Sequence, residues 1–143
     1  MILCGVEVPS DFGPDGHSDA DVALHALCDA MLGALALGDI GMHFPDTDER
    51  YKGIDSRELL AHVYALVQDN GYALENADIT VVLQSPKLRP HIADMRASVA
   101  NVLGCELDQI SVKATTEEKL GFTGSGEGIA AHAVVLLNKN QEI

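Results

Sequence analysis

Tryptophan is absent from this 143-residue sequence, and aromatic and cationic residues are scarce. Aromatic residues make up 4% of the chain against 47% for all hydrophobic residues, so aliphatic and alanine side chains must fill the core. Lysine and arginine together number nine against 22 aspartates and glutamates, which gives a net charge of −13. Proteins that bind nucleic acid usually present a basic face to its phosphates, so this composition argues against a nucleic-acid partner.

Long hydrophobic runs and paired cysteines are also lacking. The longest apolar stretch, residues 30–37, is interrupted by Gly33 and is too short for a membrane span, and we see no secretory signal pattern. We therefore expect no membrane partner and a cytoplasmic location, or a plastid-type organelle if the source is eukaryotic. Cys4, Cys28 and Cys105 contain no CxxC pair, so we expect small hydrophobic side chains and not a disulfide scaffold.

The hydrophobic periodicity predicts one α/β domain over residues 1–143, in the form of a two-layer α+β fold with a sheet packed against helices. Helices are expected over residues 19–37, 55–70 and 91–103, and strands over residues 2–8, 77–83, 110–114 and 129–137. Ser18 or Asp19 is the expected cap of the first helix and Gly38 its expected stop. The last strand is apolar without interruption, which predicts burial on both faces.

A cluster of histidine and carboxylate residues lies on the first predicted helix. Asp21, His25 and Asp29 are spaced i, i+4 and i+8, so they share one side of the helix. A histidine with carboxylates one turn away suits a metal ligand that is oriented by its neighbours. The same spacing suits a surface ladder of ion pairs, and the spacing alone favours the ladder.

Three further segments carry polar groups at the ends of predicted elements. Residues 17–19 (HSD) precede a helix, where free N–H groups can receive a phosphate or the side chains can simply cap. Residues 113–119 (KATTEEK) follow a strand, and their hydroxyls and carboxylates could hold phosphate and a divalent cation, or form a capped turn. Residues 84–90 (QSPKLRP) could contact a base or merely connect two elements. The glycines of residues 121–128 fit neither a P-loop nor a dinucleotide fingerprint, and we expect them to permit tight turns and close packing.

These segments together resemble a known enzyme family over nearly the whole chain and in the same order. The matching motifs are residues 17–29 (HSDADVALHALCD), 38–41 (GDIG), 44–48 (FPDTD), 55–60 (DSRELL), 86–91 (PKLRPH) and 113–124 (KATTEEKLGFTG). They are similar to the signature of the 2-C-methyl-D-erythritol 2,4-cyclodiphosphate synthase family. The resemblance implies a homotrimer with active sites between neighbouring subunits, a CDP-linked small-molecule substrate, and zinc together with magnesium or manganese as cofactors.

The resemblance also implies a role for individual residues. His25 would be a zinc ligand, and His17 and Ser18 would bind the methylerythritol phosphate end, with His17 steadying the transition state. The ribose contacts would be Asp39, Ile40 and Gly41. Residues 44–48 would form a mobile flap over the substrate that includes Phe44, Asp46 and Asp48. The cytosine contacts, largely through main-chain groups, would be Leu83, Pro86, Lys87, Leu88 and Arg89. Thr115 and Thr116 would contact the diphosphate, with Thr116 catalytic, Glu118 would bind substrate and the magnesium or manganese ion, and Phe122 would contact substrate.

The implied reaction is an intramolecular phosphoryl transfer. The 2-phosphate of the substrate attacks the β-phosphorus of its own CDP group, CMP leaves, and a cyclic diphosphate forms without a protein nucleophile. Holding two anionic phosphates together and neutralising their charge with metal ions would supply the catalysis. Such a role for metals is compatible with an acidic protein that has few lysines and arginines.

The sequence departs from the family pattern in three places. The family begins with a strand that carries an Asp-x-His pair, the other two zinc ligands, and we interpret this chain as lacking that strand. Ala20 stands where the family usually has Gly, and Ser125 where it often has Arg facing the central cavity of the trimer, so the sequence leaves isoprenoid phosphate binding there open. Two other functions stay open: a non-catalytic trimeric cytidine nucleotide-binding protein, and a metal-dependent phosphohydrolase that uses Asp19, Asp21 and Glu118.

Overall fold

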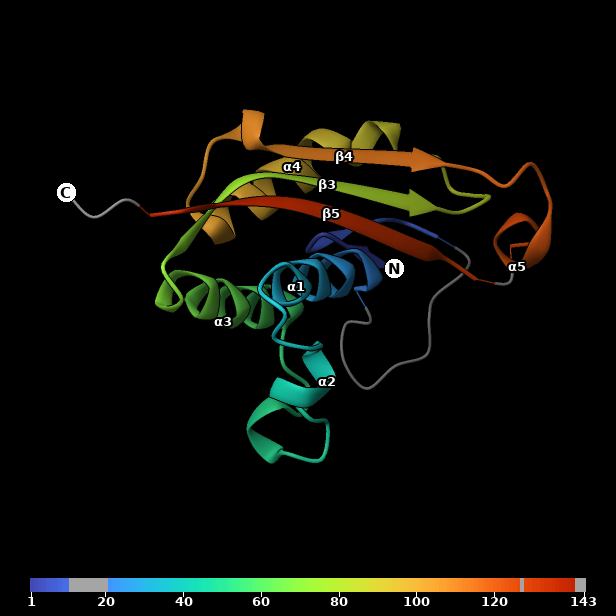
Figure 1. Cartoon of the computed structure of the whole chain (residues 1–143). Helices are drawn as coiled ribbons and strands as arrows, with labels where there is room; N and C mark the ends of the chain where they lie inside the picture. The colour runs from blue at the N-terminus through green and yellow to red at the C-terminus, as the bar shows by residue number, and fades with distance from the viewer. Residues whose placement is uncertain (11–20, 127, 141–143) are drawn as a thin grey trace.

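The computed structural model describes residues 1–10, 21–126 and 128–140. Its centre is a three-stranded mixed sheet in the order β4-β3-β5, and the long helices pack against one face of this sheet (Figure 1). The central strand β3 (Tyr72–Val82) pairs in parallel with β4 (Ile110–Thr115) and antiparallel with β5 (Ala130–Lys139). The predicted fold class, a sheet packed against helices in two layers, is confirmed.

The core lies between the sheet and the helices α1 (Val22–Ala34), α3 (Ser56–Asp69) and α4 (Ile92–Leu103). In the described part of the chain, its buried hydrophobic side chains are aliphatic, methionine, cysteine or alanine, as the low aromatic content predicts. Cys4 and Cys28 are fully buried, and burial raises the pKa of both thiols, so these two cysteines are protonated hydrophobic groups. Cys105 is half-buried and, like the other two, forms no disulfide.

The N-terminal segment is a hairpin and not the single strand predicted over residues 2–8. β1 (Ile2–Leu3) and β2 (Val6–Glu7) pair antiparallel across a two-residue turn. Cys4 and Gly5 both have positive φ, 52° and 75°, which is the backbone of a type I′ turn. The buried carboxylate of Asp21 accepts both turn N–H groups, from Cys4 at 2.9 Å and from Gly5 at 2.7 Å. This long-range support explains why a strand-like pattern turns back on itself.

Helix α1 is shorter at both ends than predicted. Its cap is Asp21, whose carboxylate also accepts the N–H of Leu24, and not Ser18 or Asp19. At the other end the N–H groups of Ala36 and Leu37 bond to the carbonyls of Gly33 and Leu32, which is a Schellman motif. Ala36 has φ 56°, in the left-handed position that glycine usually occupies at the end of a helix. The sequence therefore carries no glycine signal where α1 ends, and Gly38, the predicted stop, lies beyond that end.

The other elements lie close to their predicted positions. α3 begins after its cap Asp55, α4 ends at Gly104 in the left-handed conformation, and β3 starts five residues earlier than expected, at Tyr72. The long segment between α1 and α3 contains the short helices α2 (Ile40–His43) and η1 (Glu49–Tyr51). Three further single turns complete the fold: η2 (Arg89–His91), η3 (Leu107–Gln109) and α5 (Gly121–Gly124).

Strand β5 is not buried on both faces, and that prediction is wrong for the single chain. Ala133, Val135 and Leu137 pack against the core, whereas Val134 and Leu136 on the opposite face are 71% and 58% exposed. Since all three long helices cover the same face of the sheet, the apolar residues of the other face remain in solvent. No helix within the described ranges is long and apolar enough to cross a membrane.

Candidate functional site

The segments predicted to contact cytosine and diphosphate leave the sheet at one edge. β3 and β4 are parallel, and their last paired residues are Val82 and Thr115. The Leu83 N–H then donates to the Thr115 carbonyl at 3.1 Å, which holds the two chains together one residue further. Both strands therefore deliver their following loops to the same end of the sheet, where α5 also lies (Figure 1). Carboxyl ends of parallel strands are where α/β folds usually build binding sites.

The loop after β3 exposes main chain and cations and hides its apolar side chains. Leu83 and Leu88 are buried, which leaves their backbone groups as the available contacts. Lys87 and Arg89 are exposed. The Ser85–Pro86 peptide bond is cis. This arrangement suits the predicted main-chain recognition of a base, with two cations nearby for phosphate.

The loop after β4 has an unusual backbone at the predicted metal residue. Glu118 and Lys119 have φ of 53° and 66°, the left-handed region that residues with a side chain rarely adopt. Thr116 Oγ1 accepts the Glu118 N–H at 2.8 Å. A Cβ on Gly124 would lie 2.4 Å from the Lys119 carbonyl carbon, so α5 packs directly on this turn and the predicted close packing of the glycine-rich segment is confirmed. Phe122 and the turn residues are exposed.

The predicted ribose-binding segment is tied to α1. Asp39 caps α2 and accepts the Met42 N–H at 3.0 Å. The next N–H, of Ile40, donates to Asp29 Oδ1 at 2.9 Å. His43 Nε2 donates to the Leu37 carbonyl at 2.6 Å. These bonds give the GDIG motif a defined position beside the C-terminal half of α1.

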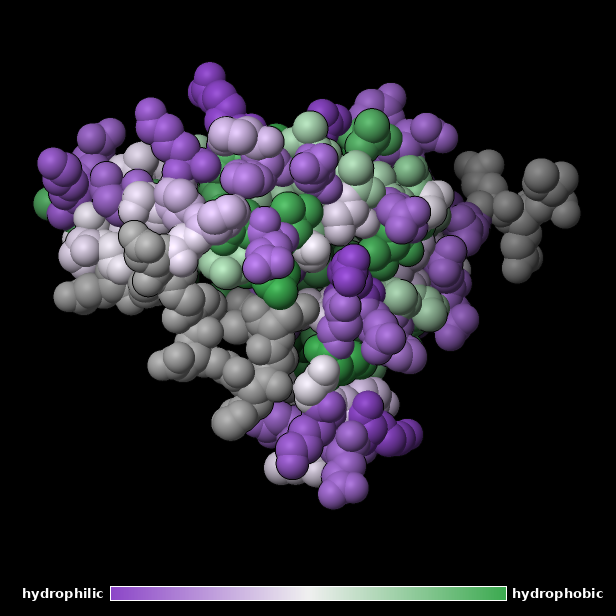
Figure 2. Space-filling model, turned by 180° about the vertical axis from the view of Figure 1, so that it is seen from behind, coloured by the Kyte–Doolittle hydropathy of each residue, from purple (hydrophilic) through white to green (hydrophobic). Residues whose placement is uncertain are grey.

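The predicted flap is anchored by its aromatic residue. The Phe44 ring lies edge-on to Tyr51, with ring centroids 5.1 Å apart, and 6.1 Å from the ring of His62 on α3. The following lobe, residues 45–53, is mostly hydrophilic on the face that Figure 2 shows. Asp48 binds Arg50 at 2.8 Å, and this side-chain hydrogen bond holds the pKa of Asp48 below its usual value. Asp46 is exposed and available to a ligand.

The three residues spaced along α1 have separate partners and form no common site. Asp21 is buried under the N-terminal hairpin, Asp29 binds Ile40, and His25 Nε2 lies 3.1 Å from Ser56 Oγ. These partners differ from those of the simple ion-pair ladder, and a metal role for His25 stays a prediction. Within the described residues, no three histidine, cysteine or carboxylate side chains are grouped so that they could hold a metal ion. His17, Ser18 and Asp19 lie outside those residues, as does Ala20.

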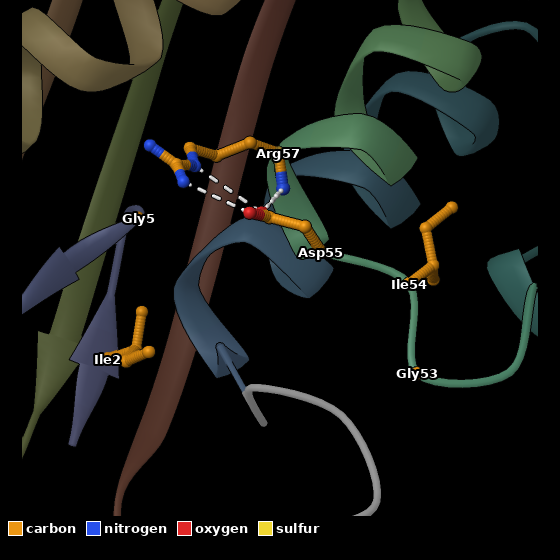
Figure 3. A pocket seen from close by; sticks show the side chains of 6 residues that line it. All are labelled: Ile2, Gly5, Gly53, Ile54, Asp55 and Arg57. Carbon is orange, nitrogen blue, oxygen red and sulfur yellow. Dashed lines mark hydrogen bonds and ion pairs between the residues drawn. The ribbon is translucent and has the colours of Figure 1, made fainter.

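A separate pocket of about 250 Å³ lies between the N-terminal hairpin and the start of α3 (Figure 3). Its lining residues are Ile2, Gly5, Gly53, Ile54, Asp55 and Arg57. Two of these residues bond to each other, since Arg57 donates to both carboxylate oxygens of Asp55. No residue predicted to bind substrate lines this pocket, and the sequence carries no signal for it because its two sides come from segments about 50 residues apart.

Comparison with known proteins decides the family. The model of the YgbB family matches residues 1–138. The chain belongs to the YgbB family. Two relatives of this YgbB chain are the 2-C-methyl-D-erythritol 2,4-cyclodiphosphate synthases of Trichlorobacter lovleyi, 61% identical over 96% of this chain and 87% of that protein, and of Ectopseudomonas mendocina, 63% identical over 97% and 88%. The resemblance inferred from the motifs is confirmed.

Solved structures of YgbB-like proteins share the fold. A 2-C-methyl-D-erythritol 2,4-cyclodiphosphate synthase solved in its CDP-bound form is 40% identical, with a TM-score of 0.89 over 96% of this chain and 89% of that chain. The bifunctional IspDF from Campylobacter jejuni is 45% identical, with a TM-score of 0.92 over 97% of this chain. The present chain spans 38% of that larger protein.

Proposed function

We propose that the protein converts 4-diphosphocytidyl-2-C-methyl-D-erythritol 2-phosphate to 2-C-methyl-D-erythritol 2,4-cyclodiphosphate and releases CMP. The observation that carries this proposal is the identity of about 60% to synthases over nearly the whole chain. The geometry supports it, because the predicted base and diphosphate segments leave the same edge of the sheet. A cytoplasmic location stays a prediction.

The proposed reaction closes a ring within one bound molecule. An oxygen of the 2-phosphate bonds to the β-phosphorus, the bond from that phosphorus to the oxygen bridging to the α-phosphorus breaks, and the electron pair leaves with CMP. The loop of residues 83–89 would hold cytosine and the 39–41 segment the ribose. Thr115 and Thr116 would donate to the diphosphate, with His17 and Ser18 at the 2-phosphate end. Holding both phosphates in one orientation supplies the rate advantage of an intramolecular reaction.

The metal requirement is part of the proposal, and the two ions differ in how well the described residues suit them. Glu118 is exposed and follows Thr115 and Thr116 closely in the sequence, so this segment offers carboxylate and hydroxyl oxygens, the donor type that suits magnesium or manganese shared with substrate phosphates. Such an ion would neutralise negative charge on the phosphates. For zinc, His25 is the predicted ligand that lies among the described residues, whereas catalytic zinc needs three protein ligands. Zinc binding through His25 therefore remains a prediction, and none of the steps above depends on it.

A homotrimer is proposed from the family resemblance. The open face of the sheet supports an assembly that covers it, since Val134 and Leu136 expose apolar surface on β5. Analytical ultracentrifugation should give three times the chain mass. Replacing Val134 with Lys should shift the protein toward the monomer, whereas a wild-type monomer at micromolar concentration would contradict the proposal.

The deciding experiment is turnover of the CDP-linked substrate with zinc and magnesium supplied. CMP and the cyclic diphosphate should appear in equal amounts, measured by chromatography and ³¹P NMR. Inorganic phosphate in place of CMP would indicate the phosphohydrolase, and tight CDP binding without turnover would indicate the nucleotide-binding protein. The high identity to synthases does not favour either alternative.

Thr116 gives a site-specific version of this test. Thr116→Ala should lower kcat by about 10–100-fold, because it removes a proposed donor to the diphosphate and the acceptor for the Glu118 N–H. Thr116→Ser keeps the hydroxyl and should retain most of the activity. Equal loss in both variants would argue that the hydroxyl is not the group that matters.

A further inference from the structure

Gln84 joins the two loops that follow β3 and β4. It comes directly after Leu83, where the backbone ladder between the two strands ends. Its side-chain Oε1 accepts the Lys119 N–H at 3.2 Å, across 35 residues of sequence. One partner therefore belongs to the loop proposed to hold cytosine, and the other to the loop proposed to hold the diphosphate.

The turn that Gln84 contacts is strained. Glu118 and Lys119 are consecutive residues with left-handed φ, and neither is glycine. Such conformations persist where the surrounding structure holds them, and they cluster at functional sites. Here the N–H of each strained residue bonds to a side-chain oxygen, Glu118 to Thr116 Oγ1 and Lys119 to Gln84 Oε1. Gly124 packs against the Lys119 backbone from the other side.

The side chains of Thr116 and Gln84 restrain this turn in different ways. Thr116 lies two residues from Glu118, so its bond shapes the turn locally. The bond from Gln84 fixes the same turn relative to a different loop, and so sets the distance between the cytosine and diphosphate contacts. If the Lys119 bond were lost, the turn could relax toward right-handed φ and carry the Glu118 carboxylate with it.

We propose that Gln84 is a positioning residue of the site, which holds the Thr116–Lys119 turn in register with the base-binding loop so that the site favours a diphosphate over a monophosphate. The proposal rests on the proposed function for the identity of the ligand. A glutamine suits this role because its oxygen accepts a hydrogen bond without adding a third negative charge beside Glu117 and Glu118.

The test combines one structural and one binding measurement on three variants. Gln84→Ala removes the acceptor, Gln84→Glu keeps an acceptor but adds charge, and Gln68→Ala is the matched control on α3, beyond the opposite end of β3. Amide hydrogen exchange followed by NMR reports the Lys119 N–H directly. It should be about tenfold faster in Gln84→Ala and close to wild type in Gln84→Glu and Gln68→Ala.

Nucleotide binding supplies the second measurement, because CDP and CMP share base and ribose and differ by one phosphate. Gln84→Ala should weaken CDP binding about tenfold, equivalent to about 1.4 kcal/mol, and CMP binding less than threefold. Gln84→Glu should also weaken CDP binding, by repulsion, while its Lys119 exchange stays slow. Gln68→Ala should change neither affinity.

The outcomes separate this inference from the proposed function. Unchanged Lys119 exchange in Gln84→Ala, or equal losses of CDP and CMP affinity, would overturn the positioning role, since equal losses are what general damage to the site produces. A wild-type protein that binds CDP in a Gln84-dependent way but releases no CMP from the full substrate would reject the proposed reaction and support the positioning role.

Discussion

The two segments that flank the proposed site are held in place by different means. Residues 38–53 have mostly ordinary backbone and are fastened by side chains, through the Asp29 carboxylate, the His43 ring and the Phe44 ring. Residues 116–124 contain two strained residues and, in addition to the side-chain bonds from Thr116 and Gln84, are fastened by close backbone packing of Gly124 against Lys119. The comparison indicates that residues 38–53 can lose one side-chain contact and keep the others. In residues 116–124, by contrast, a shift of the backbone at one position must move the packed neighbours as well.

The largest effect is expected at Gly124. Gly124→Ala would place a methyl group 2.4 Å from the Lys119 carbonyl carbon, so the turn or α5 must move. We expect a loss of about 3 kcal/mol in the free energy of unfolding, measured with urea, and a fall in CMP release. Gly33→Ala is the matched control, because nothing lies within 4 Å of the added methyl group. It should stabilise the protein by up to about 1 kcal/mol, and a similar cost in both variants would contradict the packing argument.

A smaller effect is expected at Phe44. Phe44→Ala removes the contacts with Tyr51 and His62, and because the ring is half-buried the cost should be about 2 kcal/mol in urea unfolding. Phe44→Leu keeps apolar volume but not the edge-on ring pair, and should cost about half as much. If the ring acts instead as a free cover over the substrate, Phe44→Ala would change KM and leave stability as it is.

Asp29 comes next. Asp29→Ala deletes the acceptor for the Ile40 N–H and should cost about 1 kcal/mol of stability, with a several-fold rise in KM because the segment proposed to bind ribose loosens. Asp69→Ala, at the exposed end of α3, is the control and should change neither quantity by much. An unaltered KM in Asp29→Ala would show that the GDIG motif keeps its position without this anchor.

The exposed Asp48–Arg50 pair should have the smallest effect. Its hydrogen bonds lower the pKa of Asp48 below the ordinary 3.8, so the pair stabilises the fold above about pH 4 and loses this contribution as the pH falls through the lowered pKa. Thermal unfolding of wild type and Arg50→Gln should therefore differ slightly at pH 6 and converge near pH 2. A difference that grew toward low pH would have the wrong sign.

Local signals explain which elements could be predicted from the sequence. Asp55 caps the start of α3 and Gly104 caps the end of α4, so each helix carries its boundary signal in its own sequence. Both helices were therefore predicted within one residue of their observed bounds. Ala36 occupies a glycine-type position without glycine, so the end of α1 was misplaced. The Cys4–Gly5 turn was missed because its support comes from Asp21, 16 or 17 residues away.

The site was predictable by resemblance more than by spacing. The motifs grouped the cytosine, ribose and diphosphate segments, but the roles of Asp29 and Gln84 were not found. Each of these side chains binds a backbone N–H, of Ile40 and Lys119 respectively, in a distant segment. Such a bond leaves no periodicity in the sequence, and any polar residue of the right length could in principle make it. The exposed face of β5 was missed for a related reason, since burial depends on what packs on a strand and not on its composition.

Asp21 gives the N-terminal region a particular kind of cooperativity. One carboxylate accepts both amides of the hairpin turn and also caps α1, so detaching the first eight residues would strip the Cys4 and Gly5 amides of their acceptor at once, while the Leu24 amide keeps its own. Opening of residues 1–8 therefore costs both of these bonds, which opposes local fraying of the hairpin.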